Sequence, residues 1–253
     1  MVRFDGYAVT ITMNGGVISG NRNGGVRVGG GTFIMSGGAI SGNTSSRSRV
    51  GSETGGAGVY VANKGSSFTM SGGKISGNEV SGDGGYGGGV ALYNGGTFTM
   101  NGGEISGNIA SGQGGGVCAN STFIMNNGII ASNTAPNGGG VFVNGDFAQS
   151  GGTVSSNTAR ENGGGVYVSE SGTFTKTGGS VTGYANDTNT GNAVKENSGS
   201  IRNYRGHAVY ASSSDSGLKI KEITAGQGDN LSFVSTSRGY MKYSHTINGA
   251  WDN

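Results

Sequence analysis

The sequence repeats one phrase at nearly regular intervals, and this repetition limits the fold more than any other feature. The phrase GGTFTMNGGEISGN at 95–108 returns as GSSFTMSGGKISGN at 65–78, and looser copies run from residue 8 to about 183. A period of about 25 residues that tolerates insertions is typical of a solenoid, in which each unit stacks only on its neighbours. The Asn residues that close successive copies are Asn21, Asn43, Asn78, Asn108, Asn133 and Asn157.

Each repeat contains three short segments in which apolar and polar residues alternate, and clusters of Gly separate them. Examples are GVYV at 58–61, TFTM at 97–100 and EIS at 104–106. Alternation bounded by Gly predicts strands and turns, and no helical periodicity competes over 8–183. We therefore predict an all-β chain, a right-handed parallel β-helix of three sheets and roughly seven to eight coils with an irregular C-terminal cap. The right hand follows from the general preference of parallel crossovers.

The second segment of the repeat predicts the interior of the stack. Its Phe and Met residues share one face of the strand, and its Thr residues share the other. The residues expected inside are Phe33, Phe68, Phe98, Phe123, Phe147 and Phe174, with Met13, Met35, Met70, Met100 and Met125. The closing Asn is expected to bond the backbone of the next coil at a tight corner, which makes it structural.

Composition excludes several classes of protein. The 57 Gly follow no collagen period, and the regular apolar positions argue against a disordered Gly-rich tract. A net charge of +2 is too small for a nucleic-acid surface. Cys118 is the only cysteine, so neither an internal disulfide nor a cysteine-based metal site is expected. No apolar run approaches the ~20 residues of a membrane span, and we expect neither membrane insertion nor a cofactor.

The repeats divide the chain into two parts. Residues 1–211 are assigned to the β-helix, regular over 8–183 and degenerate over 184–211, and residues 212–253 to a capping segment. A solenoid needs such a polar cap to avoid exposing the edge of a sheet. The first residues carry no signal-peptide pattern and already belong to a repeat, so we expect the solenoid to continue upstream.

At this point the residues resemble a known family. The pattern GGGVYV followed by GTFTMSGGxISGN is similar to the glycine-rich repeat of bacterial cell-surface and secreted proteins with a pectate-lyase-like right-handed β-helix. The resemblance covers roughly residues 8–183, and the segment beginning GHAVYASS is similar to the ending that follows such repeats. It implies a secreted or cell-surface location and a role in adhesion. It carries little information about activity.

Two outward-facing rows are candidate binding surfaces. The first row lies on the first segment and reads Arg27, Tyr60, Ala91, Cys118, Phe142, Tyr167 and Tyr210. Its aromatic members Tyr60, Phe142, Tyr167 and Tyr210 are predicted to be exposed and to contact a glycan or a surface protein. The alternative is that aromatic residues simply favour strands, and Ala91 and Cys118 interrupt the row.

The second row is a Thr-x-Thr ladder on the second segment, which resembles the ice-contacting face of repeat-built ice-binding solenoids. Its Thr members are Thr10, Thr12, Thr32, Thr69, Thr97, Thr99, Thr122, Thr173 and Thr175. Ile34, Ile124, Asp146 and Ala148 interrupt it. A plain solvated sheet is the alternative, because Thr is a good strand residue.

Catalytic groups are not evident in the sequence. A polysaccharide lyase needs clustered carboxylates for Ca²⁺, and a hydrolase needs two carboxylates at a fixed separation. The 14 acidic residues fall at unrelated positions of the repeat, so no catalytic or metal-binding residue is predicted. The favoured function is a non-enzymatic extracellular surface or adhesion module that binds glycan or protein. Its expected binding surfaces are the aromatic row and the insertions after the closing Asn, at 44–54, 79–86, 109–113 and 158–161. Ice binding is the first alternative, and a polysaccharide lyase or hydrolase is the second.

Overall fold

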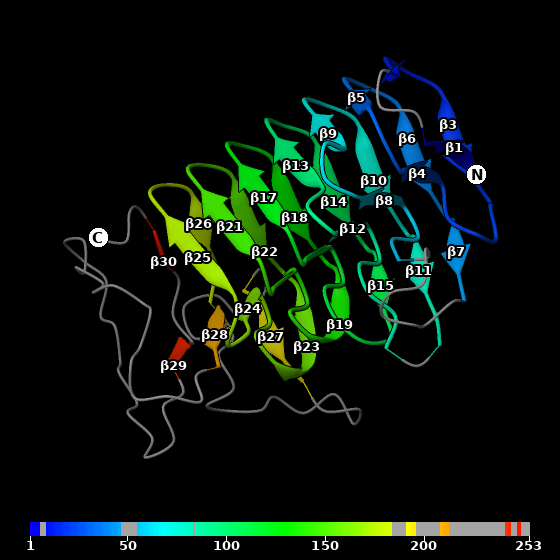
Figure 1. The fold of residues 1–253 in the computed structure, drawn as a ribbon. Coiled ribbons are helices and arrows are strands. Elements are labelled where there is room, and N and C mark those ends of the chain that lie inside the picture. Colours follow the sequence, from blue (N-terminus) through cyan, green and yellow to red (C-terminus); the bar gives the residue numbers. More distant parts are fainter. Residues whose placement is uncertain are drawn as a thin grey trace.

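The fold is the parallel β-helix that the repeat predicts. The computed structural model describes residues 1–5, 9–46, 55–82, 84–183, 191–195, 208–212, 241–243 and 247–248. Within these residues every regular element is a β-strand, and the strands stack in chain order into four sheets around one axis (Figure 1). No helix in the described part of the chain is long and apolar enough to cross a membrane.

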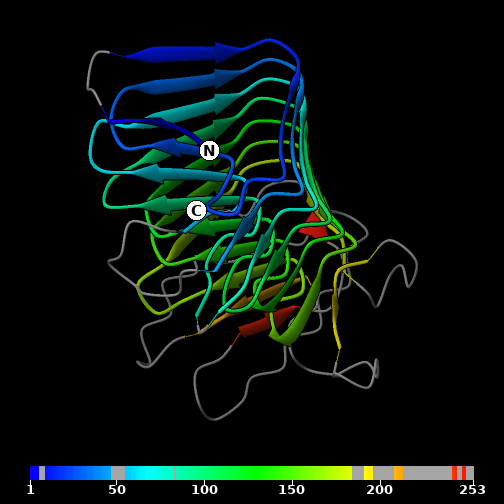
Figure 2. The same ribbon diagram turned by 90° about the vertical axis from the view of Figure 1, so that its right-hand side faces the viewer.

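One coil of the stack passes once through each sheet. The coil that begins at β12 (Val90–Tyr93) continues through β13 (Thr97–Met100), β14 (Glu104–Ser106) and β15 (Ile109–Ala110). We name the four sheets A, B, C and D in that order. Figure 2 shows the same strands of successive coils lying side by side.

Sheets A and B hold the first two segments of the repeat. Sheet A contains β1 (Val2–Phe4), β4 (Val26–Val28), β8 (Val59–Ala62), β12, β16 (Val117–Ala119), β20 (Val141–Val143), β24 (Val166–Val168), β28 (Val209–Ala211) and β29 (Met241–Tyr243). Sheet B contains β2 (Thr10–Met13), β5 (Thr32–Met35), β9 (Ser67–Met70), β13, β17 (Thr122–Met125), β21 (Asp146–Gln149) and β25 (Thr173–Lys176). The eight parallel strands of A and seven of B agree with the predicted seven to eight coils.

Sheets C and D complete each coil. Sheet C contains β3 (Val17–Ser19), β6 (Ala39–Ser41), β10 (Lys74–Ser76), β14, β18 (Ile129–Ala131), β22 (Thr153–Ser155), β26 (Ser180–Val181) and β30 (Ile247–Asn248). Sheet D contains β7 (Thr44–Ser45), β11 (Glu79–Val80), β15, β19 (Thr134–Asn137), β23 (Thr158–Asn162) and β27 (Ala193–Val194).

Sheet D corrects the prediction of three sheets. It occupies the positions after the closing Asn that the sequence indicated as variable insertions, although residues 47–54 and 83 lie outside the described residues. Strands such as β11 and β15 have two residues each, with one side chain buried and the other exposed. Two residues are too few to produce a recognisable alternation of apolar and polar residues, and the sequence pattern therefore indicated a loop at these positions.

The interior is built from columns of like residues, because the coils stack in register. Phe98 pairs with Phe68 on one side and with Phe123 on the other. From Phe33 to Phe174 the rings stack with centroids 4.7–5.1 Å apart. The Met column beside them is equally buried, and it ends in two polar residues, Gln149 and Lys176. The Lys176 ammonium donates hydrogen bonds to the carbonyls of Gly178 and Gly179 at 2.9 and 2.8 Å.

The closing Asn residues form a second buried column, as predicted. Asn108 is fully buried, and its backbone N–H and its Nδ2 both donate to Oδ1 of Asn133 in the next coil, at 2.9 and 3.0 Å. Its Nδ2 also donates to the carbonyl of Ile75 in the preceding coil at 2.9 Å. The same pattern recurs at Asn43, Asn78, Asn133 and Asn157.

Two antiparallel strands lie at the C-terminal end of the stack. β29 pairs with β28 in sheet A, and β30 pairs with β26 in sheet C. These two strands are the described parts of the segment that we assigned to the cap, together with Ser212. The rest of 212–253, including Tyr240 and Trp251, lies outside the described residues.

Candidate ligand-binding groove on sheet A

The aromatic row lies on the outer side of sheet A, and its members are partners in register along the stack. Arg27 pairs with Tyr60, Ala91 with Cys118, and Phe142 with Tyr167. The expectation that its aromatic side chains are exposed is wrong for three of the four. Tyr60, Phe142 and Tyr210 are 7%, 4% and 6% exposed, and only Tyr167 is half-buried.

The row is buried because the chain folds back over it at the glycine corners before β8, β12, β16, β20 and β24. Gly87 lies above Ala91, so that a Cβ at Gly87 would stand 2.7 Å from the Ala91 Cβ. Gly114 has the same position one coil later, with φ of 67°, and a Cβ there would collide with the Val117 carbonyl. Only glycine fits such a corner.

The aromatic rings of the row also cover one another. Phe142 and Tyr167 stack with centroids 5.1 Å apart at 8°, and Tyr167 stacks on Tyr210 at 5.2 Å and 14°. At the other end the Arg27 guanidinium lies 4.9 Å from the Tyr60 ring centroid. Both faces of Tyr167 are therefore occupied within the protein, and the row is not a continuous platform on which sugar rings could stack.

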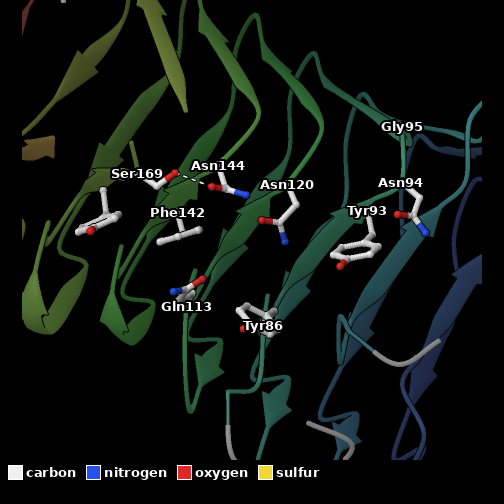
Figure 3. Close-up of a pocket in the computed structure, with 10 residues that line it drawn as sticks. Tyr86, Tyr93, Asn94, Gly95, Gln113, Asn120, Phe142, Asn144 and Ser169 are labelled. Atoms are coloured by element: carbon white, nitrogen blue, oxygen red, sulfur yellow. Dashed lines mark hydrogen bonds between the residues drawn. The ribbon is translucent and has the colours of Figure 1, made fainter. Parts of the chain in front are cut away.

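A groove lies beside the interruption of the row. Between Tyr60 and Phe142 the row holds only Ala91 and Cys118, and beside this gap lies a groove of about 560 Å³ (Figure 3). Its lining residues are Tyr86, Tyr93, Asn94, Gly95, Gln113, Asn120, Phe142, Asn144, Tyr167 and Ser169. Two of the predicted contact residues, Phe142 and Tyr167, belong to it, whereas Tyr60 and Tyr210 do not.

One side of the groove comes from the residues that end the strands of sheet A. Asn120 and Asn144 directly follow β16 and β20, and Ser169 directly follows β24. Their backbone N–H groups continue the ladder of hydrogen bonds between coils. The Ser169 hydroxyl donates to Oδ1 of Asn144 at 2.6 Å, and Nδ2 of Asn120 approaches Sγ of Cys118 at 3.5 Å.

The other side comes from the residues that precede the glycine corners. Tyr86 and Gln113 are bridged in parallel between neighbouring coils. In Figure 3 they lie opposite Asn120 and Asn144, with Phe142 between the two groups. The groove thus crosses the strands and runs along the axis of the stack, with polar side chains on both sides.

The groove carries no formal charge at neutral pH. Its ten lining residues include no Asp, Glu, Lys, Arg or His. Burial raises the pKa of Tyr86, with smaller contributions from Cys118 and Tyr93. Burial also raises the pKa of the neighbouring Cys118 thiol to about 12, against a small opposing effect of its hydrogen bond with Asn120. The groove therefore offers neutral donors and acceptors beside aromatic rings.

The Thr ladder lies on sheet B and takes no part in this groove. It forms two columns in register, with Thr97 beside Ser67 and Thr122, and Thr99 beside Thr69 and Ile124. Thr10, Thr12, Thr173 and Thr175 are exposed, and Thr32, Thr69, Thr97, Thr99 and Thr122 are half-buried. The interruption at Asp146 and Ala148 lies where the sequence placed it, between β17 and β25.

Sequence reasoning identified only part of the groove. Tyr86 and Gln113 end the insertions at 79–86 and 109–113, which were expected to contribute to binding. Tyr93, Asn120 and Asn144 lie at strand ends and were not predicted. Asn recurs directly after the first segment of the repeat. This recurrence could have indicated a row of polar side chains, but it also has a structural explanation. Asn94 has φ of 49°, a conformation that Asn tolerates better than most residues. Among the described residues, no group of three His, Cys, Asp or Glu could hold a metal ion.

Comparison of the chain with protein-family models, with curated proteins and with solved structures found no match. The geometry of the molecule therefore carries the functional inference.

Proposed function

We propose that this chain is a non-enzymatic binding module of a secreted or cell-surface bacterial protein, and that the groove on sheet A binds a neutral glycan. One observation carries the proposal: an uncharged groove in which half-buried Tyr86 and Tyr93 lie among the amide side chains of Asn94, Gln113, Asn120 and Asn144. Its volume lies within the usual range for small-ligand sites, about 300–1,000 Å³.

The chemistry of the lining fits sugar hydroxyls. Amide side chains both donate and accept hydrogen bonds, as neighbouring hydroxyls of a sugar do. Tyrosine combines an apolar ring, which can cover the C–H face of a sugar, with a hydroxyl that hydrogen-bonds. An anionic polysaccharide would find no Lys or Arg among the lining residues, which favours a neutral ligand.

The repeat of the fold favours an extended ligand. Tyr93, Asn120, Asn144 and Ser169 lie on four successive coils. Neighbouring strands are about 4.8 Å apart, so these positions span roughly 14 Å along the stack. A linear oligosaccharide that lies along the groove would present successive units to successive coils.

Binding without cleavage is the better supported reading of the groove. A hydrolase needs two carboxylates at the scissile bond, and a Ca²⁺-dependent lyase needs several oxygen ligands for the ion. The lining residues supply no carboxylate. The resemblance to bacterial surface repeats supports the secreted or cell-surface location.

A glycan array followed by calorimetry on the intact chain tests the proposal. We expect a neutral oligosaccharide to bind, and we expect Asn144→Ala and Tyr86→Ala each to weaken binding about tenfold, the equivalent of one lost interaction of ~1.4 kcal/mol. Asn101→Ala is the matched control, because Asn101 is an exposed amide beyond sheet B. Equal affinity in all four proteins would exclude the groove. New reducing ends or unsaturated products would instead place the protein among the polysaccharide-cleaving enzymes.

A further inference from the structure

The outer face of sheet B carries three columns of short side chains, one more than the Thr ladder contains. The ladder hydrogen bonds continue beyond each strand, since the N–H of Asn101 donates to the Met70 carbonyl and that of Asn126 to Met100. All members of this third column are exposed. They are Asn14, Ser36, Ser71, Asn101, Asn126, Ser150 and Thr177.

The three columns form a regular two-dimensional array. The seven strands of sheet B pair without a register shift, and no bulge interrupts them. Positions in neighbouring coils are about 4.8 Å apart, and alternate positions along a strand are about 6.7 Å apart. Short side chains with hydroxyl, methyl or amide groups therefore recur at fixed intervals in both directions.

Hydrogen bonds between coils hold many of these side chains in place. The Ser36 hydroxyl donates to Oδ1 of Asn14 at 2.7 Å, and Ser67 donates to the Thr32 hydroxyl at 3.0 Å. Asn126 is bonded on both sides, to Asn101 at 2.8 Å and to Ser150 at 2.9 Å. Because these side chains are already held in place, the surface loses little conformational entropy when a layer of water becomes ordered against it.

The array is almost free of charge. Of three positions on each of seven strands, only position 146, an Asp, holds an acidic or basic residue. A charged group orients the nearest water molecules around itself. Beside uncharged hydroxyl and methyl groups, the positions of the water molecules instead follow the spacing of the array. The first hydration layer over this face is then expected to repeat with the period of the coils.

We propose that the outer face of sheet B binds ice. Ice is an uncharged surface that repeats in two dimensions, as this face does, and an ordered water layer can merge with it. A protein partner would instead be held by a few large anchors such as Trp, Tyr or Arg at the centre of the contact. The three columns contain none, because the Phe rings of the same strands point inward.

The size of the face sets the strength of the expected activity. The part without a charged residue or an Ala covers β2 to β17, roughly 19 Å along the stack and 13 Å along the strands. Within it, Ile34 and Ile124 have methyl groups but no hydroxyl. On the next strand Asp146 introduces a charge, and Ala148 lacks the γ-hydroxyl and γ-methyl groups of Thr. These two residues separate β25 from the rest of the array. We expect inhibition of ice recrystallisation and partition into growing ice, with little thermal hysteresis.

Ice-affinity partition of the full chain tests this proposal independently of the groove, because the two surfaces share no residue. The wild-type chain is expected to enter the ice, and Thr99→Tyr to remain in the liquid with an unchanged melting temperature. Thr153→Tyr, on the outer face of sheet C, is the matched control and is expected to partition like the wild type. Exclusion of the wild type from ice would overturn the proposal, as would partition of a folded Thr99→Tyr variant.

A second variant keeps the proposal testable if Thr99→Tyr does not fold. Asp146→Thr combined with Ala148→Thr removes the interruption and joins all seven strands into one array. This variant is expected to inhibit recrystallisation at a lower protein concentration than the wild type does. An unchanged or higher inhibitory concentration would contradict the role of the array.

Discussion

Single buried residues fix the spacing of the coils. Each fully buried closing Asn, from Asn43 to Asn157, uses its full hydrogen-bonding capacity. In Asn78, both Nδ2 hydrogens have acceptors, the Ile40 carbonyl and Oδ1 of Asn108. Its Oδ1 accepts from the backbone N–H and the Nδ2 of Asn43. No other side chain of this size is both donor and acceptor on adjacent atoms. Asn thus recurs at this corner as a structural residue.

Replacing one member of this column is expected to destabilise the whole stack. Asn108→Ala removes the Oδ1 that accepts from the N–H and the Nδ2 of Asn78, and the Nδ2 that donates to the Ile75 carbonyl. This loss is expected to lower the free energy of unfolding by about 3 kcal/mol or more. The exposed Asn101→Ala is expected to change it by less than about 0.5 kcal/mol. Denaturant titration of both variants measures the difference, and equal midpoints would contradict the structural role.

Cys118 makes stability depend on alkaline pH. Burial raises its pKa from 9.0 to about 12, so between these values the unfolded chain loses the thiol proton and the folded chain keeps it. The free energy of unfolding is therefore expected to fall as pH rises, by up to about 1.4 kcal/mol per pH unit from this group. Comparison with Cys118→Ala between pH 8 and 11 isolates the effect. Parallel pH profiles of the two proteins would show that the thiol is not protected by the fold.

At the scale of single elements, the glycine corners decide where each strand of sheet A begins. Gly107 and Gly114 have nearly the same φ, 64° and 67°, but different surroundings. A Cβ at Gly107 would have its nearest neighbour at 3.9 Å, whereas one at Gly114 would stand 2.8 Å from the Cα of Cys118 and closer still to the Val117 carbonyl. The corner at Gly107 is open to solvent, whereas the corner at Gly114 folds back on the strand that follows it.

This pair separates backbone strain from steric collision. Gly107→Ala is expected to lower the free energy of unfolding by about 1–2 kcal/mol, the usual effect of a positive φ on a residue with a Cβ. Gly114→Ala is expected to lower it by more than about 3 kcal/mol, because a collision is added. Thermal or denaturant unfolding of both variants measures the two effects. Equal losses would mean that the chain does not fold back over sheet A.

The elements also show how far the sequence alone can predict this molecule. Register, the Phe column and the Asn column follow from the period, because like residues at one repeat position must stack. Sheet D was missed because four of its six described strands have only two residues, too few to alternate visibly, and because its segments vary in length and sequence between repeats. The row containing Tyr60 and Phe142 was expected to be exposed because alternation indicates which side of a strand a residue lies on, not what covers that side. The groove depends on Tyr86 and Gln113, whose corners the period leaves free.

At the scale of the whole molecule, residues at the same position of the repeat lie side by side along the stack. A difference between repeats therefore changes the surface at one place in a column. One row has large residues in most coils and small ones at Ala91 and Cys118, and a groove lined by polar side chains from four coils lies beside this interruption. The nearly uniform Thr, Ser and Asn positions of sheet B produce the opposite, a regular face. The proposed glycan binding thus depends on a column of sheet A in which the residues differ between coils. The proposed ice binding depends on columns of sheet B in which they are nearly the same.

Chemical-shift mapping by NMR tests the central claim, that the groove on sheet A is the glycan site, most directly. The chain would be titrated with the best neutral oligosaccharide from the array while the backbone and side-chain amide signals are followed. We predict that the perturbed signals cluster at Asn94, Gln113, Asn120 and Asn144, while the amides of sheet C stay unchanged. Shifts confined to another face of the stack, or no saturable shift with any neutral glycan, would contradict the claim.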